Sequence, residues 1–127
     1  MSHLDRTIFE DSTWDELAAT GIYLELDLFG VEVSYYQQKP SMYMPHDGQR
    51  IDRVLYLLKH GYLKQILLSH DIHTNHRLVS FGGHGYSHIF AHIVPRLLDA
   101  GLTQEQIDTF VIRNPAEWLR FRTKNTE

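Results

Sequence analysis

Apolar and polar residues alternate with a period of two in the segment GIYLELDLFG, residues 21–30. This alternation is typical of a β-strand, because successive side chains of a strand point to opposite faces. A second apolar run, at residues 65–69, is also interpreted as a strand. Residues 1–2 could form the remnant of a third, so the pattern predicts a very small sheet.

Apolar residues recur every three or four positions in residues 47–60 and again in residues 87–100, which predicts two amphipathic helices. Pro95 lies inside the second helix and predicts a kink or a short first half. Thr103 and Gln106 have the spacing of a capping box and predict a further short helix.

Strands that alternate with helices predict an α/β fold with a parallel sheet. Ligands of such folds gather at the carboxyl ends of the strands, so Asp27 and Asp71, which follow the two predicted strands, are candidate site residues. Residues 31–45 contain two prolines and three tyrosines and are expected to form a long loop. A complete (β/α)₈ barrel needs about 250 residues. The 127 residues are therefore expected to be the last part of something larger.

Composition narrows the class of protein. The net charge of −4 argues against a nucleic-acid partner, and no apolar run approaches the roughly 20 residues of a membrane span. Cysteine is absent, and the N-terminal residues do not resemble a signal peptide, so a cytoplasmic protein with no membrane partner is expected. The nine histidines are a reason to look for a metal site.

Five segments, in this order, resemble the C-terminal part of phosphotriesterase-related proteins of the amidohydrolase superfamily: MSHLDRTI, YLELDLFG, RVLYLLKHGYLKQILLSHDIHT, GGHGYSHI and NPAEWLRF. The resemblance implies that residues 1–121 are the C-terminal βα units of a (β/α)₈ TIM barrel, a partial barrel with parallel strands, and that residues 122–127 are a frayed tail. It also implies a hydrolase with two Zn²⁺ ions in each complete site.

The resemblance carries metal-ligand roles to two residues. His3 matches the family's histidine after strand six, and Asp71 matches the family's aspartate after strand eight. Asp71 would also accept the proton of the attacking hydroxide, and Asp5 matches a family acid that passes the proton outward. The family's other metal ligands have no counterpart here, so the isolated chain is expected to be inactive.

Bacterial phosphotriesterases have a histidine where this chain has Leu28, directly after Asp27, which argues against an organophosphate triester as the natural substrate. Relatives of this branch imply a small-molecule substrate such as an N-acyl amide. The loop at residues 82–88 would form part of the pocket wall. The substrate-pocket candidates are Asp27, His84, Tyr86 and His88.

Structural readings stand beside these functional ones. Asp71 could be a helix cap or turn residue, and Asp27 a strand-end cap. His70 and His73 match no family ligand and are interpreted as loop residues, and His84 and His88 could be structural histidines. A non-catalytic truncated product that acts as a binding or regulatory fragment is the alternative to the hydrolase, and an independent small α/β metal-binding domain is a third hypothesis. The oligomeric state is not predicted.

Overall fold

The computed structural model describes residues 1–121, and the tail predicted at 122–127 lies outside the described residues. Within this part, no helix is long and apolar enough to cross a membrane. The α-helices are α1 (Leu4–Thr7), α2 (Asp11–Ala19), α3 (Asp47–Lys59), α4 (Val94–Asp99), α5 (Gln104–Asp108) and α6 (Asn114–Leu119). The strands are β1 (Leu24–Leu26), β2 (Tyr35–Tyr36), β3 (Lys39–Tyr43) and β4 (Ile66–Leu68). Short helical segments are η1 (Leu63–Gln65), η2 (Asn75–Arg77), η3 (Val79–Phe81), η4 (Ile89–Ile93) and η5 (Thr109–Arg113).

The two strands predicted from the apolar runs form a parallel pair. β1 pairs with β4 in the register Leu24 with Ile66 and Leu26 with Leu68. Met1 lies along β1, because its carbonyl accepts from the Glu25 amide at 3.1 Å and its ammonium group donates to the Tyr23 carbonyl at 2.7 Å. The N-terminal residue thus lies where a neighbouring strand would lie, as expected of a remnant at residues 1–2.

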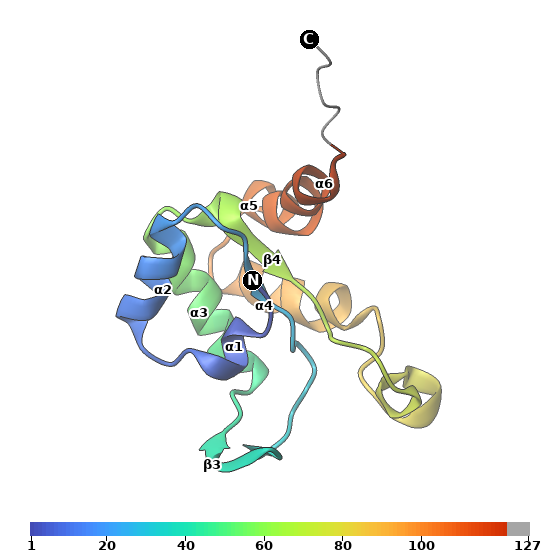
Figure 1. Cartoon of the computed structure of the whole chain (residues 1–127). Helices are drawn as coiled ribbons and strands as arrows, with labels where there is room; N and C mark the ends of the chain where they lie inside the picture. The colour runs from blue at the N-terminus through green and yellow to red at the C-terminus, as the bar shows by residue number, and fades with distance from the viewer. Residues whose placement is uncertain (122–127) are drawn as a thin grey trace.

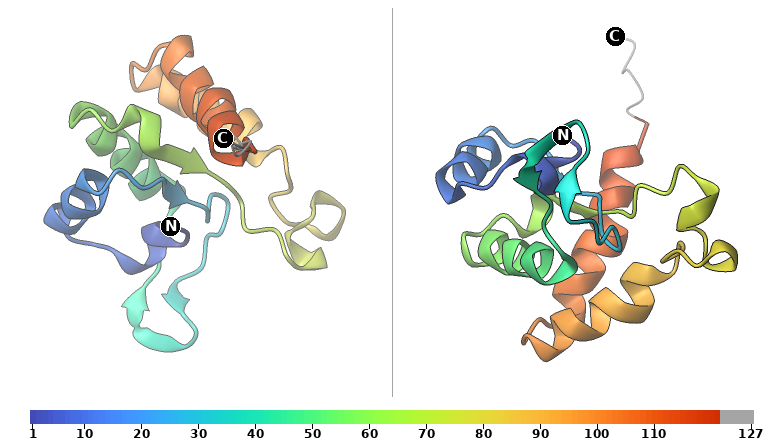
Figure 2. Two further views of the ribbon diagram at one scale, coloured as in Figure 1. Left: turned by 45° about the horizontal axis from the view of Figure 1, so that its top comes forward. Right: turned by 90° about the horizontal axis from the view of Figure 1, so that it is seen from below.

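The strand pair has one face in the core. Leu24, Leu26 and Ile66 are fully buried, and Glu25 points to the opposite face, as the period of two requires. Helices α2 and α3 lie on one flank of the strand pair, and α5 and α6 lie on the other (Figures 1 and 2). Fully buried apolar side chains on these flanks include Trp14 of α2, Leu57 of α3 and Phe110 of η5, which joins α5 to α6.

Helices α4 and α6 each follow a π-helical segment and contain a proline. Segment η4 precedes α4, which contains Pro95, and segment η5 precedes α6, which contains Pro115. Proline has no N–H and its ring crowds the carbonyl four residues earlier, so the wider π turn accommodates it. The predicted helix at 87–100 is present, with its first half π-helical rather than broken.

The capping box predicted at Thr103 is confirmed. The Thr103 hydroxyl accepts from the Gln106 amide at 3.3 Å, and the Gln106 side chain accepts from the Thr103 amide at 2.9 Å. The helix that starts there is longer than the short helix predicted, because η5 and α6 continue it to Leu119.

The expectation of a long loop at residues 31–45 was wrong. This segment contains the antiparallel hairpin β2–β3, in which Tyr35 pairs with Tyr43. Tyrosine favours strands, and Pro40 is tolerated because the hairpin strand is an edge. The guanidinium of Arg6, in α1, lies 4.8 Å from the centre of the Tyr36 ring and holds the hairpin on the N-terminal helix.

The amide of Asn114 fastens the last helix to the sheet. Its Nδ2 donates to the Leu63 carbonyl and to the Ile66 carbonyl, both at 2.8 Å, and the residue is 5% exposed. Replacing it would leave the buried Ile66 carbonyl without this donor, whereas the Leu63 carbonyl would keep the backbone amide of Ile66 as its donor.

We expect Asn114→Ala to lower the free energy of unfolding by about 1–3 kcal/mol, because the buried Ile66 carbonyl loses this donor. Urea denaturation of the purified chain measures this. Gln104→Ala, which removes an exposed hydrogen bond to Asp108 on α5, is the control and should cost only a few tenths of a kcal/mol. Equal losses in the two variants would contradict the role given to Asn114.

Candidate functional site

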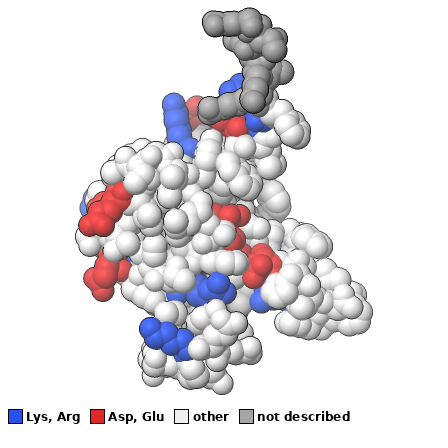
Figure 3. Space-filling view, in the orientation of Figure 1, with Lys and Arg blue, Asp and Glu red and all other residues white. Residues whose placement is uncertain are grey.

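The carboxyl ends of β1 and β4 meet at one edge of the molecule, as the parallel arrangement predicts. Pairing continues past the strands, since the Ser69 amide donates to the Leu26 carbonyl at 3.1 Å and the Phe29 amide donates to the Ser69 carbonyl at 3.2 Å. Asp27 directly follows β1, and Asp71 lies three residues past the end of β4. Acidic side chains gather near the middle of the face shown in Figure 3. We call the edge at the carboxyl ends of β1 and β4, where Asp27 and Asp71 lie, the rim.

His3 is tied to Asp27 at the rim. The Asp27 carboxylate accepts from the His3 backbone amide with both oxygens, at 3.1 Å each, and its Oδ1 lies 2.9 Å from Nδ1 of the His3 ring. An ionised carboxylate can only accept, so Nδ1 carries a proton, and in the neutral imidazole Nε2 then keeps a lone pair. This is the arrangement that prepares a histidine to bind a metal ion through Nε2.

Asp5 is buried in an ion pair. Its Oδ2 accepts from Nε of Arg50 at 2.9 Å and from the Leu28 amide at 3.3 Å, while its buried Oδ1 has no partner among residues 1–121. Burial raises the pKa of Asp5 above its ordinary value, and the positive charge of Arg50 offsets this only in part. Asp5 can therefore hold a proton more readily than an exposed aspartate.

Arg50 extends this ion pair across the rim. It is 1% exposed and donates through Nη1 to Oδ1 of Asp47 at 2.8 Å, and the Gly30 amide donates to the same oxygen at 2.9 Å. Oδ2 of Asp47 lies 2.7 Å from Nε2 of His88. Burial alone would raise the pKa of Asp47, but the hydrogen bonds from Gly30, His88 and Arg50 outweigh it and lower the pKa.

His88 belongs to a group of imidazole rings. The rings of His84 and His88 have centroids 5.5 Å apart, and those of His70 and His84 are 6.1 Å apart. Nε2 of His70 accepts from the Ile89 amide at 3.1 Å, and Nε2 of His84 lies 3.3 Å from the His70 carbonyl oxygen. Burial, with the neighbouring His84 and His88, lowers the pKa of His70 to about 4.

Glycine is required where the loop after β1 passes His84. Gly30 has φ of 88°, and a Cβ at this position would lie 2.4 Å from Cγ of His84. Three of the predicted pocket residues, Asp27, His84 and His88, make polar contacts at the rim. The fourth, Tyr86, is 68% exposed.

Asp71 is held by a neighbouring arginine. Arg77 donates through Nη1 to the Asp71 carbonyl oxygen and to Oδ2, the latter at 3.0 Å. His3 and Asp71 are both suitable metal donors by their chemistry, and His3 has its Nε2 free of the Asp27 bond. Within the described residues, however, no group of three His, Asp or Glu side chains could hold a metal ion. Residues 1–121 thus bring together no complete set of metal donors.

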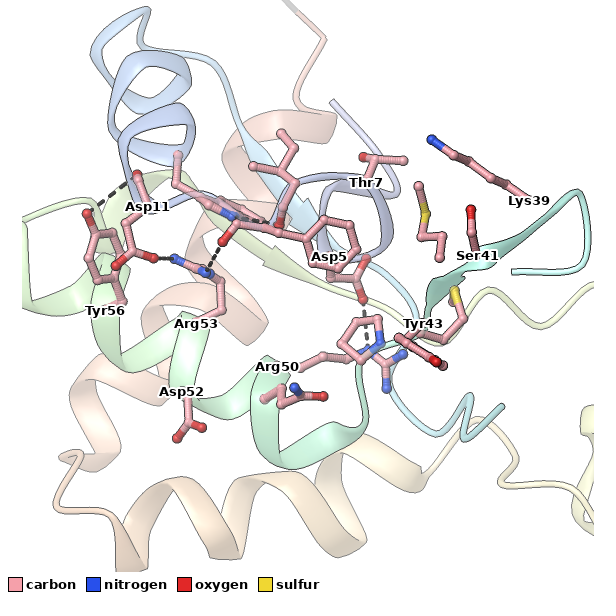
Figure 4. A pocket seen from close by; sticks show the side chains of 17 residues that line it. Asp5, Thr7, Asp11, Lys39, Ser41, Tyr43, Arg50, Asp52, Arg53 and Tyr56 are labelled. Atoms are coloured by element: carbon pink, nitrogen blue, oxygen red, sulfur yellow. Dashed lines mark hydrogen bonds and ion pairs between the residues drawn. The ribbon is translucent and has the colours of Figure 1, made fainter. Parts of the chain in front are cut away.

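A large hollow lies beside the rim. It has a volume of about 1060 Å³ and is bounded by the N-terminal helices, the hairpin strand β3 and helix α3. Figure 4 shows Asp5 and Arg50 pointing toward one another at one end, while Arg53 reaches Asp11 at the other. Of the catalytic, metal and substrate-pocket candidates named above, only Asp5 lines this hollow.

The sequence predictions missed Asp47, Arg50 and Arg77. One signal was available, because Arg50 lies on the same helical stripe as Val54 and Leu57, four and seven positions later. A charged side chain on a buried stripe needs a buried partner. Nothing in the local pattern marks Arg77, whose contacts depend on how the loop closes.

Comparisons with known proteins agree with the fold. A model of the phosphotriesterase family matches residues 1–119. The chain is 53% identical over 121 residues to a phosphotriesterase-related protein of Drosophila melanogaster, covering 95% of this chain and 35% of that protein. It is 53% identical over 122 residues to an N-acetyltaurine hydrolase of Mus musculus, covering 96% of this chain and 35% of that protein. The chain thus spans about a third of the length of these relatives.

A solved structure shows the same arrangement. The chain superposes on a resiniferatoxin-binding protein from Rhodobacter sphaeroides with a TM-score of 0.82 and 33% sequence identity, covering 90% of this chain and 31% of that chain. The prediction of parallel βα units from a TIM-barrel protein is confirmed. The described residues themselves form a small α/β unit with a parallel strand pair and no closed barrel.

We expect Arg50→Met to lower the free energy of unfolding by about 3–5 kcal/mol, because it leaves Asp5 and Asp47 buried without their cation. Arg113→Met is the control, since Arg113 and Glu105 form an exposed pair at 3.6 Å. That variant should cost no more than about 1 kcal/mol. Chemical denaturation followed by circular dichroism compares the two, and a loss below 1 kcal/mol for Arg50→Met would refute the structural role.

The lowered pKa of Asp47 predicts a pH dependence. Its carboxylate binds protons more weakly in the folded chain than in the unfolded chain, so its contribution is full above 3.8, its ordinary pKa, and is lost as the pH falls through the folded value. The stability difference between wild type and Asp47→Asn should therefore shrink as the pH falls from 5 toward 2.5. Denaturation at a series of pH values tests this, and a difference that stays constant over that range would contradict the role given to Asp47.

Proposed function

Because the chain belongs to the phosphotriesterase family, we propose that its rim is part of the active site of a metal-dependent hydrolase. The observation that carries this proposal is the pair of family-matched donors at one edge of the parallel strands, His3 and Asp71. His3 is already oriented by Asp27 at 2.9 Å, with Nε2 left to bind.

We assign His3 and Asp71 as donors for divalent ions, which we propose to be zinc, two in each complete site. When bound, such ions lower the pKa of a bound water, so that hydroxide is available near neutral pH. Asp71 is in addition the proposed proton acceptor. Asp5 is the proposed outlet for the proton, and its raised pKa and unpaired Oδ1 support this role.

We propose a small N-acyl amide as the substrate. Support comes from the N-acetyltaurine hydrolase of mouse, to which the chain is 53% identical, and from Leu28 at the position that is a histidine in bacterial phosphotriesterases. The pocket walls would include Asp27, His84 and His88, with Tyr86 at the exposed margin.

The absence of cysteine supports a cytoplasmic location.

We further propose that the chain alone does not catalyse this reaction. A catalytic zinc ion needs about three protein ligands, and two family-matched donors cannot hold a pair of such ions. The remaining donors would have to come from residues like those in the part of the relatives that this chain does not match, which is about two thirds of their length.

A chimera tests the proposal. The segment of the mouse N-acetyltaurine hydrolase that matches this chain over 122 residues is replaced by the corresponding residues of this chain. We expect the chimera to hydrolyse N-acetyltaurine, and we expect His3→Gln and Asp71→Asn each to lower kcat/KM by at least about 100-fold, because each removes a metal donor.

The matched control is Asp52→Asn, an exposed change on α3 that should leave kcat/KM unchanged. Full activity of the Asp71→Asn chimera, or no hydrolysis by a folded chimera, would count against the proposed site. The isolated chain assayed with added Zn²⁺ should show no hydrolysis, and turnover there would overturn the claim that it is inactive alone.

A further inference from the structure

Three large apolar side chains lie exposed on the loop that follows β4. Val79 is 67% exposed, Phe81 is 64% exposed and Tyr86 is 68% exposed. The loop projects from the body of the molecule, beyond the carboxyl ends of the strands (Figure 1). A group of exposed apolar side chains on a projecting segment is typical of a surface that binds another molecule. We call Val79, Phe81 and Tyr86 the loop patch.

The backbone of the loop holds these side chains outward. The Gly83 amide donates to the Leu78 carbonyl at 2.9 Å. The Gly85 amide donates to the Arg77 carbonyl, also at 2.9 Å. Gly85 packs against Val79 so closely that a Cβ on the glycine would lie 2.4 Å from Cγ2 of Val79. Because the loop is already closed, binding through the patch requires little further ordering of the chain.

The loop carries almost no charge. Between Asp71 and Arg96, Arg77 is the only Asp, Glu, Lys or Arg residue, and its guanidinium is paired with Asp71 at 3.0 Å. In Figure 3 the projecting loop is white, whereas acidic and basic side chains are spread over the body of the molecule. The whole chain has a net charge of −4, so two copies repel one another where their acidic surfaces meet. At the loop patch, two copies can meet without like charges facing each other.

The last residues of the sequence are unsuited to cover the patch, because residues 122–127, RTKNTE, include no apolar residue. Other exposed apolar side chains, Ile112 and Trp118, lie along η5 and α6 on a flank of the strand pair. The helices of a (β/α)₈ barrel form a ring around its strands, so a further βα unit would pack at such a flank. A unit packed there leaves the loop patch free, because the patch lies beyond the strand ends.

We infer that the loop patch is a self-association surface, at which two copies of this chain pair about a two-fold axis. Each copy presents the same patch in such a pair, so Val79 and Phe81 of one copy pack on apolar side chains of the other. An apolar centre with few charges is typical of homodimer interfaces. This inference goes beyond the proposed function and depends on neither metal binding nor catalysis. Because Tyr86 lies at the proposed pocket margin, pairing would bring the second copy beside that margin.

Sedimentation velocity of the full 127-residue chain tests the inference. We expect a monomer–dimer equilibrium that depends on protein concentration. Val79→Ser and Phe81→Ser should each weaken the dimer by about tenfold or more, because each removes an apolar contact at the centre of the interface. Tyr43→Ser is the matched control, since Tyr43 is 79% exposed on β3, outside the loop. This change should alter dimerisation by less than about twofold.

Three results would overturn the inference. The first is a chain that sediments as a monomer at every concentration. The second is a dimer that both loop variants leave unchanged, and Trp118→Ser then shows whether its contact lies at α6 instead. The third is binding of the wild-type chain, but not of Phe81→Ser, to neutral phosphatidylcholine vesicles without any dimer in their absence, which would make a lipid surface the partner.

A measurement on the wild-type chain covers the case in which the loop variants do not fold. Dilution of the ¹⁵N-labelled chain should shift the amide signals of residues 79–86 as the dimer dissociates, and it should leave those of the β2–β3 hairpin in place. Shifts confined to residues 112–119, or no shift in any signal, would contradict pairing through the loop patch.

Discussion

A single buried guanidinium holds together the parts of the chain that form the rim. Arg50 is almost fully buried and bonds Asp5 of α1, Asp47 of its own helix and the Val31 carbonyl of the loop after β1. Through Asp47 it also reaches Gly30 and His88. A buried arginine is tolerable only when its N–H donors are hydrogen-bonded and nearby negative charges balance its own charge. The carboxylates of Asp5 and Asp47 provide that balance. Helices α1 and α3 and the loop after β1 must therefore come together around Arg50.

This constraint explains why polar residues of the rim differ in what they can do. Asp27 and Asp47 have their carboxylates filled by hydrogen bonds and act as supports, one for His3 and one for His88. Asp5 keeps one buried oxygen without a partner, and Asp71 keeps one carboxylate oxygen without a close donor among the described residues. Asp5 and Asp71 therefore each have a carboxylate oxygen that can still accept a hydrogen bond, and these are the two acids to which the family resemblance assigns catalytic roles.

Local pattern was sufficient for the elements that bury a regular apolar face. The alternation around Glu25 located β1, the spacing of Ile51 and Val54 located α3, and the parallel order placed Asp27 and Asp71 at one edge. The hairpin was missed because what holds it is remote in sequence: Arg6 packs on the Tyr36 ring.

The partners of the site residues were beyond the sequence for the same reason. His3 meets Asp27 across 24 positions, and Asp5 meets Arg50 across 45. Periodicity describes neighbours on one helix or strand and carries no information on such pairs. Proposing metal-donor roles for His3 and Asp71 needed the ordered family segments, and finding the residues that contact them needed the fold.

These separations also have a kinetic meaning. The contact between Asp47 and His88 spans 41 positions, so it closes a long loop, and loop closure costs entropy before any hydrogen bond repays it. Helix α3 can form earlier because its contacts are local. The β1–β4 pair closes a loop of similar length, since Leu24 pairs with Ile66, but it repays that cost with buried apolar contacts that the polar rim lacks. We therefore expect the rim to assemble on the native side of the folding barrier. In that case, substitutions at the rim shorten the lifetime of the folded state while leaving the rate of folding nearly unchanged.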